Sequence, residues 1–473
     1  MASLKDFIKS VSTVLPEIPK PQKKPSLNER FIWTALALIA YLIMSITPLY
    51  LFGGGNQNDP FRSLRIIFAS AQGTLMELGI GPIVTAGLIL QLLVGSEIIK
   101  LDMSNQADRA IFGSATKFLT FIVIAAESGA YILGGALGQL QSTQSIVIFA
   151  QLFIASAIVL LLDEMIQKGW GIGSGVSLFI LAGVAQTVMW YTFSPFPVNS
   201  SSGSNQSDVF GFFPALISSA FRGALSTIVV RDFRFPSLLT FILTLTMILI
   251  LIYVEGIRVE LPITSIKYRG FQGVYPIKIL YVSNIPVILV SALGANVTFF
   301  TRLLYNNIGA ASNSFLKYLA TYDSTGHPTS GLVYYITPPQ GLDQTLADPV
   351  HSVIYVAYLV TLAVFFARIW VEIGGLNPKK VAQNLMDADV QIPGFRRSGL
   401  SIEQMLNRYI PALTIIGGLI IGLVASVSDL FGVFGSGVGI LLMVDIILQY
   451  YQTLVKEQVE EFSPRLAGLL GQA

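Results

Sequence analysis

The sequence predicts an all-α polytopic membrane protein with ten transmembrane helices, and three observations lead to this prediction. Hydrophobic residues make up 53% of the 473 residues and charged residues only 12%, about half the charged share of a typical soluble domain. The mean hydropathy is +0.67. Apolar runs of about 20 residues, long enough for a helix to cross a bilayer, recur along the chain. The ten predicted spans are residues 31–51, 80–99, 115–137, 145–162, 174–191, 236–254, 284–305, 351–371, 409–428 and 434–455.

Lysine and arginine are unevenly distributed between the connections, and this predicts the orientation of the chain. Connections on the side of the N-terminus carry 21 of the 29 basic residues, and those on the other side carry 6. Cytosolic connections hold the excess of Lys and Arg in membrane proteins. We therefore expect the N-terminal segment, residues 1–30, and the C-terminal tail, residues 456–473, to be cytosolic. The net charge of only +2 does not favour a general nucleic-acid-binding protein.

The N-terminal segment does not have the pattern of a cleavable signal peptide. It is rich in Lys and Pro and has no apolar stretch before Phe31. Five apolar side chains near its start share one helical face, which predicts a short amphipathic helix on the membrane surface. A helix that docks on the protein core would show the same pattern. These five side chains are Phe7, Ile8, Val11, Val14 and Leu15.

Residues 192–235 form a long connection on the predicted external side. This Ser-rich loop carries two Asn-x-Ser sequons, at Asn199 and Asn205, which agree with an external location. A third match, Asn296-Val-Thr298, lies within a predicted span and is discounted. The sequence therefore predicts glycan acceptor sites at Asn199 and Asn205.

Residues 61–72 are apolar on one side but too short to cross a membrane. Gly79, Gly81 and Pro82 should delay the span that follows, because Pro lacks the amide hydrogen that a helix uses. We therefore expect an external helix that dips into the membrane and returns. Non-helical backbone is tolerated at this depth only against protein or a water-filled cavity. This region should therefore line the centre of the molecule.

The second half of the chain repeats this feature. Pro286 lies at the opening of the seventh span as Pro82 lies at the opening of the second. Pro-interrupted helices in matching positions of two halves indicate a central pathway. The sequence therefore predicts two halves of five spans each, residues 31–191 and 236–455.

Polar side chains inside the spans are costly in a bilayer and usually face the protein interior. Glu127 lies mid-span, where it would join a polar cluster or a proton relay, or hold two packed helices together. Arg368 and Asp445 lie near the inner ends of their spans, where we expect them to snorkel toward water. The polar side chains of this class are Thr85, Gln91, Glu127, Asn296, Arg368 and Asp445.

Two cytosolic loops, residues 255–283 and 372–408, are longer than a topology signal requires. The first alternates apolar and polar side chains around two glycines, which predicts a β-hairpin-like arm. Two basic arms suit an anionic partner such as RNA, although the ordinary excess of positive charge on the cytosolic side would produce the same composition. The basic residues considered are Arg258, Lys267, Arg269, Lys278, Lys379, Lys380, Arg396 and Arg397.

Residues that perform bond chemistry are scarce. The chain has no cysteine, which excludes disulfides, thiolate metal sites and cysteine nucleophiles. Its two histidines, His327 and His351, complete no catalytic triad. The glycines within residues 169–175 follow no strand, so they predict a tight loop and a close-packed helix start rather than a nucleotide site. We expect no enzyme activity, no catalytic residue, no cofactor and no metal.

Several stretches, such as GTLMELGIGPIVTAGLILQLL and IPGFRR, resemble the SecY family, the channel subunit of the protein-conducting translocon. The resemblance covers most of the chain and is closer to the archaeal and eukaryotic branch. It implies two pseudo-symmetric halves around an hourglass pore, an external plug helix and a lateral gate that opens to lipid. The matching stretches are residues 73–93, 162–180, 258–289, 334–355, 392–397, 406–414 and 435–442.

The resemblance also implies roles for individual residues. The aliphatic pore ring would consist of Ile80, Val84, Val176, Ile180, Ile288 and Leu442. The plug would include Phe61, Leu64, Ile66, Ile67, Phe68 and Ala71. The polar cluster of the lateral gate would consist of Thr85, Glu127 and Asn296, with Glu127 standing where some family members have Gln. Docking of the ribosome or another partner would use Arg258, Lys267, Arg269, Lys278, Arg396 and Arg397.

The resemblance implies a function and a set of partners. The chain would pass secretory polypeptides across the membrane and release transmembrane segments sideways into lipid. Its partners would be a SecE-like gamma subunit, a small beta subunit, the ribosome, signal sequences and nascent polypeptides. A secondary transporter of a small solute is the alternative, which the shortage of midplane charge and the two basic arms disfavour. We expect an archaeal plasma membrane, with the endoplasmic reticulum membrane as the alternative.

Overall fold

The structure is a computed structural model in which most of the chain is described. The described residues are 15–50, 65, 68–96, 98–99, 101, 105–133, 137, 140–199, 207–229, 231, 235–265, 272–308, 314–323, 327–339, 341–387, 390–391 and 399–462. The amphipathic helix predicted near the N-terminus lies outside these residues except for Leu15, and Asn205 also lies outside them.

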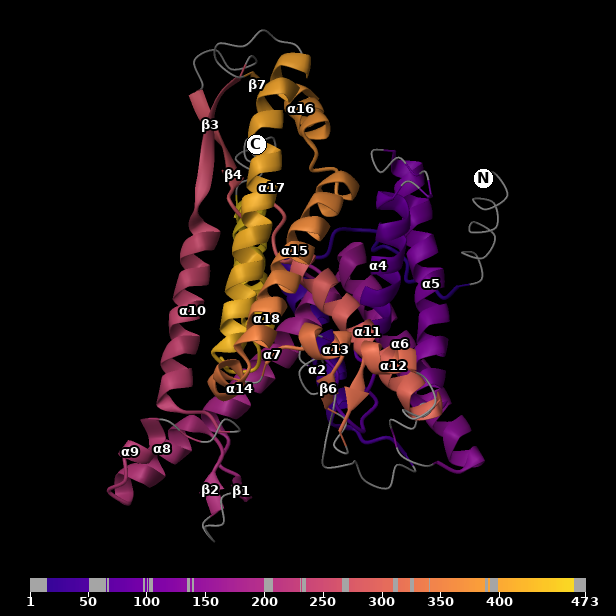
Figure 1. The fold of residues 1–473 in the computed structure, drawn as a ribbon. Coiled ribbons are helices and arrows are strands. Elements are labelled where there is room, and N and C mark those ends of the chain that lie inside the picture. Colours follow the sequence, from indigo (N-terminus) through magenta and orange to yellow (C-terminus); the bar gives the residue numbers. More distant parts are fainter. Residues whose placement is uncertain are drawn as a thin grey trace.

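Ten helices in the described part of the chain correspond one to one with the ten predicted spans. Nine helices in the described part of the chain are long and apolar enough to cross a membrane, and α4, with 15 residues, is shorter. Figure 1 shows α4 and α5 on one side of the molecule and α10 and α17 on the other. The predicted helical membrane fold is therefore confirmed. The ten helices are α2 (Leu27–Ile46), α4 (Gly81–Gly95), α5 (Gln106–Leu133), α6 (Ser142–Met165), α7 (Gly175–Phe193), α10 (Leu238–Gly256), α11 (Ile285–Ile308), α15 (Pro349–Ile373), α17 (Gly399–Leu430) and α18 (Gly437–Phe462).

Local sequence signals start several of these helices. Ser26 begins α2 and Ser237 begins α10, each through a capping box in which the Ser side chain accepts a backbone N–H three residues later. Pro82 and Pro286 lie in the first turns of α4 and α11. A first-turn proline removes no helical hydrogen bond. The two prolines therefore open these helices rather than interrupt them, and α4 is delayed to Gly81 as predicted.

A hydrophobic cluster at the centre draws on both halves of the chain. Tyr41 of α2 and Phe179 of α7 belong to it together with Tyr355 of α15 and Leu442 of α18. The outer faces of the long helices expose large apolar side chains such as Ile154. Apolar helices exposed in this way are suited to contact with lipid.

Short elements fill the connections on the side of the molecule opposite the predicted cytosolic arms. A strand pair and two short helices lie between α7 and α10. The remaining short elements lie between α11 and α15 (Figure 1). They are β1 (Pro197–Asn199), β2 (Ser207–Val209), α8 (Phe212–Phe221), α9 (Ser226–Val229), α12 (Ser314–Leu319), β5 (Thr321–Tyr322), β6 (Pro328–Ser330), α13 (Leu332–Ile336) and α14 (Leu342–Ala347).

The predicted hairpin arm is present as strands β3 (Arg258–Ser265) and β4 (Gln272–Lys278), which pair antiparallel. The second arm contributes α16 (Pro378–Asp387) and β7 (Val390–Gln391), and β7 pairs with β3. Val381 and Leu385 of α16 pack in one cluster with Leu261 of β3. The two arms therefore form one body at one end of the molecule (Figure 1), which the sequence pattern did not predict.

Helices α15 and α17 approach closely because glycine lines their interface. A Cβ atom added to Gly418 would stand 2.9 Å from the Val364 Cα, and one added to Gly422 would stand 2.8 Å from the Val360 Cα. The four-residue spacing places both glycines on one face of α17. Small residues at this spacing let membrane helices pack backbone to backbone.

We expect Gly422→Ala to destabilise the protein by about 1–3 kcal/mol, because the added methyl group forces the two helices apart. The measurement is the thermal unfolding midpoint in detergent. Gly129→Ala on α5 is the matched control, since nothing lies within 4 Å of its added Cβ. Equal midpoints for the two variants would contradict the close-packing role of Gly422.

Candidate functional site

The six aliphatic residues assigned to a ring belong to the same hydrophobic cluster. Ile80, Ile180 and Leu442 are almost completely buried, at 0%, 1% and 0% exposure. The three others, Val84, Val176 and Ile288, are partly buried and pack against the cluster. The six come from the start of α4, from α4 itself and from α7, α11 and α18. Aliphatic side chains from four helices and both halves thus belong to one central apolar core or pack against it.

A tight turn places Ile80 at the start of α4. The Ile80 N–H donates to the Phe68 carbonyl at 2.8 Å, so the chain doubles back between these residues. Gly79 has φ +56, and a Cβ at this position would clash with the Phe68 carbonyl oxygen. Only glycine suits both the conformation and the space. The Tyr41 hydroxyl donates to the Ala69 carbonyl at 3.0 Å and fixes the other side of the turn.

The predicted plug is described only at its C-terminal end. Phe68 is helical and packs against the central cluster, and the Ala71 N–H donates to the Met76 carbonyl at 2.9 Å. Both are therefore held by the turn that precedes α4. The other predicted plug residues lie outside the described residues, and they are Phe61, Leu64, Ile66 and Ile67.

An ion pair that the sequence pattern did not predict holds this turn together. Arg65 Nη2 lies 2.7 Å from Glu77 Oε1, and Glu77 is 2% exposed. The Gly73 N–H donates to the second carboxylate oxygen of Glu77 at 2.5 Å. A buried carboxylate needs this pairing to offset its lost hydration. The only signal in the sequence was an acidic residue between a short apolar segment and a delayed span.

The three predicted gate residues meet where α4, α5 and α11 come together. The Asn296 amide donates to the Thr85 hydroxyl oxygen at 3.1 Å, which links the two halves. Glu127 of α5 is 8% exposed and lines the same small cavity as Asn296 of α11. A cavity of about 30 Å3 borders Glu127 and Asn296 and reaches Phe68 and Arg65. This space is large enough for a water molecule, and it connects the polar cluster with the turn.

Sequence comparison identifies the family. A sequence profile described as SecY matches residues 74–451, and one described as the plug domain of Sec61p matches residues 39–73. The chain belongs to the SecY family. The second match contains the segment in which the plug was predicted.

Curated relatives of this SecY-family chain span almost its whole length. The Sec61 subunit alpha protein transport protein of Dictyostelium discoideum is 40% identical over 472 residues, which is 98% of each chain. The protein translocase subunit SecY of Aeropyrum pernix is 40% identical over 475 residues, covering 99% of this chain and 98% of the relative. The chain is accordingly a multi-pass membrane protein and a channel subunit of the SecY and Sec61 alpha type.

Solved structures agree in fold. One described as a protein-conducting channel has a TM-score of 0.82 and 35% identity, and it covers 97% of this chain and 98% of its own. Sec61 in the canine ribosome-channel complex from the endoplasmic reticulum has a TM-score of 0.79 and 34% identity, with 97% and 98% coverage. The architecture of two halves is thus the one expected of the SecY family.

The burial of Asp445 contradicts the sequence prediction for this residue. It is 3% exposed and accepts hydrogen bonds from the Ser283 hydroxyl at 2.9 Å and the Gln449 amide at 2.9 Å. The prediction that Asp445 snorkels to water is therefore wrong, because Ser283 in the turn before α11 and Gln449 on its own helix α18 satisfy its carboxylate inside the protein. Arg368 is exposed and fits the prediction.

The predicted docking residues differ in their surroundings. Arg258 is exposed on β3, whereas Lys278 is half-buried and lies 3.6 Å from Glu255 at the end of α10. Lys278 therefore has a partner within the chain. The remaining predicted docking residues lie outside the described residues, and they are Lys267, Arg269, Arg396 and Arg397.

His351 and the glycine run have structural roles. The His351 ring stacks on Tyr334 at 4.2 Å, and one of its nitrogens lies 3.0 Å from the Thr337 carbonyl oxygen. Gly169 and Gly173 have positive φ, as expected for the tight loop before α7. Within the described residues no three His, Cys, Asp or Glu side chains gather as a metal site would require.

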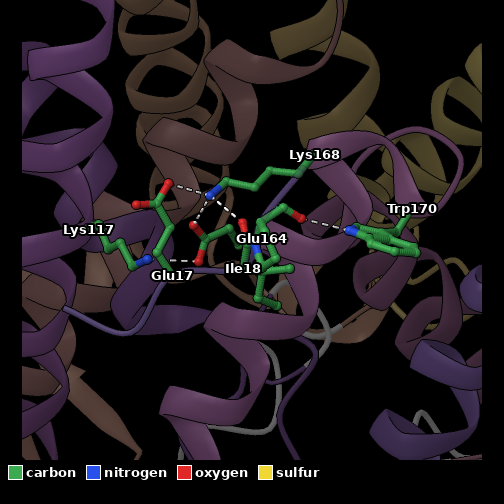
Figure 2. Close-up of polar contacts among 7 residues, drawn as sticks. Glu17, Ile18, Lys117, Glu164, Lys168 and Trp170 are labelled. Atoms are coloured by element: carbon green, nitrogen blue, oxygen red, sulfur yellow. Dashed lines mark hydrogen bonds and ion pairs between the residues drawn. The ribbon is translucent and has the colours of Figure 1, made fainter. Parts of the chain in front are cut away.

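A network on the arm side of the molecule ties the N-terminal segment to the end of α6 (Figure 2). Lys168 lies 2.5 Å from Glu17 and 2.9 Å from Glu164. The Trp170 indole N–H donates to the Pro19 carbonyl at 2.8 Å. No local sequence pattern indicates this network, because Glu17 and Lys168 are 151 residues apart in the chain. The hydrogen bond from Lys168 and its positive charge lower the pKa of Glu17 below its usual value.

The lowered pKa predicts how attachment of the N-terminal segment depends on pH. Because folding depresses the pKa of Glu17, its stabilising contribution is complete above the usual carboxylate pKa of about 4.3. It is lost as the pH falls through the lowered value. A spin label at Gln22→Cys should therefore stay immobile from pH 8 to about pH 5 and become more mobile below about pH 4. Glu17→Gln should remove this transition, and an identical transition in that variant would contradict the assignment.

Proposed function

We propose that this chain is the central pore-forming subunit of a protein translocation channel, which passes secretory polypeptides across the membrane and releases transmembrane segments into lipid. The observation that carries the proposal is the central hydrophobic cluster of a SecY-family chain, which includes or packs against the six predicted ring side chains from both halves. No residue performs bond chemistry in this mechanism. The driving energy comes from the ribosome or another motor.

The aliphatic ring acts as the seal of the resting channel. Bulky aliphatic side chains offer ions and water no hydrogen bonds, so the constriction excludes water. Aliphatic contacts are also non-directional, so the ring can fit around polypeptides of any sequence. Burial of Ile80, Ile180 and Leu442 supports a closed ring.

The turn between Phe68 and Ile80 links the plug to the ring. The Phe68 carbonyl accepts the Ile80 N–H, so a displacement of the plug pulls directly on a ring residue. The plug and the ring then respond together when a polypeptide enters. Residues 61–71 act as the plug in this proposal.

The polar cluster of Thr85, Glu127 and Asn296 acts as the latch of the lateral gate. Hydrogen bonds of this kind contribute about 1 kcal/mol each in net terms, so they are weak enough to break when a signal sequence binds. The signal sequence enters between α4 and α5 on one side and α11 and α15 on the other. Apolar segments then leave the pore by the same route.

The basic arms serve as the docking surface for the ribosome, and this side of the membrane is the cytosol. Two solved neighbours are Sec61 in the canine ribosome-channel complex and a yeast Ssh1 complex bound to the 80S ribosome. Exposure of Arg258 supports this role for the first arm. A SecE-like subunit and a small beta subunit complete the complex. The bias of basic residues supports cytosolic termini, and we favour an archaeal plasma membrane.

The chain organisation follows from this function. Residues 1–30 and 456–473 are cytosolic, and residues 192–235 connect the halves on the outside, where Asn199 and Asn205 would be glycan acceptors. The two halves, residues 31–191 and 236–455, are the bodies that move apart.

We expect Ile288→Asn to make the resting channel leak ions, because an amide in the ring lets water wet the constriction. The measurement is single-channel conductance in planar bilayers, where open time should rise by about tenfold. Ile288→Leu keeps the ring aliphatic and should remain closed. Unchanged conductance in the Asn variant would contradict the proposed role of the ring as a seal.

We expect Asn296→Leu to ease opening of the gate. The loss of about 1 kcal/mol of net hydrogen bonding shifts the closed-to-open ratio by about fivefold. Export of a reporter with a weakened signal sequence should rise, while export with a strong signal should not change. Thr85→Val combined with Asn296→Leu should add little to the single change, because both remove one interaction. Fully additive effects would argue against a shared latch.

A further inference from the structure

The connection between α7 and α10 carries large apolar side chains that the described part of the chain leaves exposed. They occur at every fourth position through α8 and into α9. Phe213, Ile217 and Phe221 share one face of α8 because they lie four residues apart within this helix, and they form an apolar stripe. The chain turns at Gly223, with φ +68, and it exposes Leu225 and Val229 beyond this turn. The exposed fractions are 36% for Phe213, 56% for Ile217, 89% for Phe221, 52% for Leu225 and 47% for Val229.

The other face of α8 is fixed to two membrane-spanning helices. The Phe212 ring is stacked on Phe241 of α10, with 4.6 Å between the ring centroids. The Gly211 N–H donates to the Ser194 carbonyl at the end of α7, at 2.9 Å. These contacts hold α8 level with the ends of α7 and α10. Figure 1 shows α8 and α9 beside that end of α10, at the end of the molecule opposite β3 and α16.

Arg231 makes a third set of contacts, which joins the two ends of this connection. The Arg231 guanidinium donates to the Val209 carbonyl at 2.9 Å and lies 4.8 Å from the Phe235 ring centroid. The segments before α8 and after α9 are therefore tied to each other. The apolar stripe is consequently presented outward from a fixed base.

The stripe continues the lipid-facing surface of α7. Phe193 is 52% exposed and stacks on Phe213, with 5.4 Å between the ring centroids. Trp190 and Phe196 are also exposed and stack at 5.6 Å. Tryptophan and other aromatic rings concentrate where the bilayer meets water. Exposed aromatic side chains thus lead without a break from a membrane-spanning helix to α8.

The polarity of this connection indicates which partner it fits. Neither α8 nor α9 contains a charged residue, and the side chains beside the stripe are small and hydroxylated, such as Ser218 and Ser226. A helix with an aromatic and aliphatic face and a weakly polar flank is suited to the boundary between headgroups and acyl chains. Because the apolar stripe continues the lipid-facing surface of α7, the partner that fits it is the same bilayer.

We propose that α8 and α9 lie in the interface of the membrane leaflet opposite the hairpin arm, with the apolar stripe among the upper acyl chains. The connection between the two five-helix halves is then anchored in lipid rather than free in water. Lipid contact here is a property of the folded chain in a bilayer and does not depend on polypeptide transport.

Single cysteines test the proposal directly, because the chain contains no cysteine of its own. Ile217→Cys and Phe221→Cys on the stripe are each labelled with the fluorophore NBD and reconstituted into phosphatidylcholine vesicles. Ser226→Cys, exposed beside the stripe, is the matched control. Quenching is measured with aqueous iodide and with lipids that carry a nitroxide either near the headgroup or near the chain end. A protein translocation assay on each labelled variant verifies that the channel is folded.

The expected result is that iodide quenches the two stripe positions at least about threefold less than position 226, as interfacial burial implies. The shallow nitroxide should quench them more strongly than the deep one. Iodide quenching equal to that at position 226 would overturn the proposal. Protection from both iodide and nitroxide that arises only after co-reconstitution with another membrane subunit would overturn it as well, since the stripe would then bind protein.

Discussion

The contact between the two halves is the constraint on which the rest of this structure depends. It must exclude ions at rest and still separate without unfolding either half. Apolar side chains from α4, α7, α11 and α18 meet at the centre and provide close contact without directional bonds. Because lipid is as apolar as these side chains, their association depends on packing. An aliphatic centre therefore suits a junction that has to open repeatedly.

The two halves meet along two lines of contact, called seams here, one between α2 and α18 and the other between α4 and α11. The polar contacts are stronger at the first seam than at the second. At one seam, Arg30 of α2 pairs with Glu457 of α18 at 2.6 Å, and the Tyr450 hydroxyl donates to the Ser174 carbonyl. At the other seam, the hydrogen bond found among the described residues is the one that the Asn296 amide donates to the Thr85 hydroxyl oxygen. An ion pair with supporting contacts holds longer than one neutral hydrogen bond. This difference favours opening at the α4–α11 seam while the α2–α18 seam stays closed, which agrees with the proposed lateral gate.

Much of the fold could be predicted from local pattern. The ten spans follow from apolar run length, and the β3–β4 hairpin follows from period-two alternation around glycines. The buried state of Asp445 could not be predicted, because it depends on Ser283, which is 162 residues away in the chain and reaches Asp445 only in the folded protein. The pairing of β7 with β3 was equally hidden, since a strand of two residues has no periodicity. Glu77 was overlooked because its partner, Arg65, is a neighbour only after the chain turns back.

The sequence by itself determined that the chain is a helical membrane protein with two basic arms and a weakly polar interior, because composition and run length are properties of single segments. It also pointed, through family resemblance, to the ring and gate residues. The tertiary structure alone decided which of these side chains meet. Thr85 and Asn296 are 211 residues apart, and their hydrogen bond exists only because α4 and α11 pack together across the two halves. Contacts of this kind depend on how complete helices pack, and no local pattern contains that information.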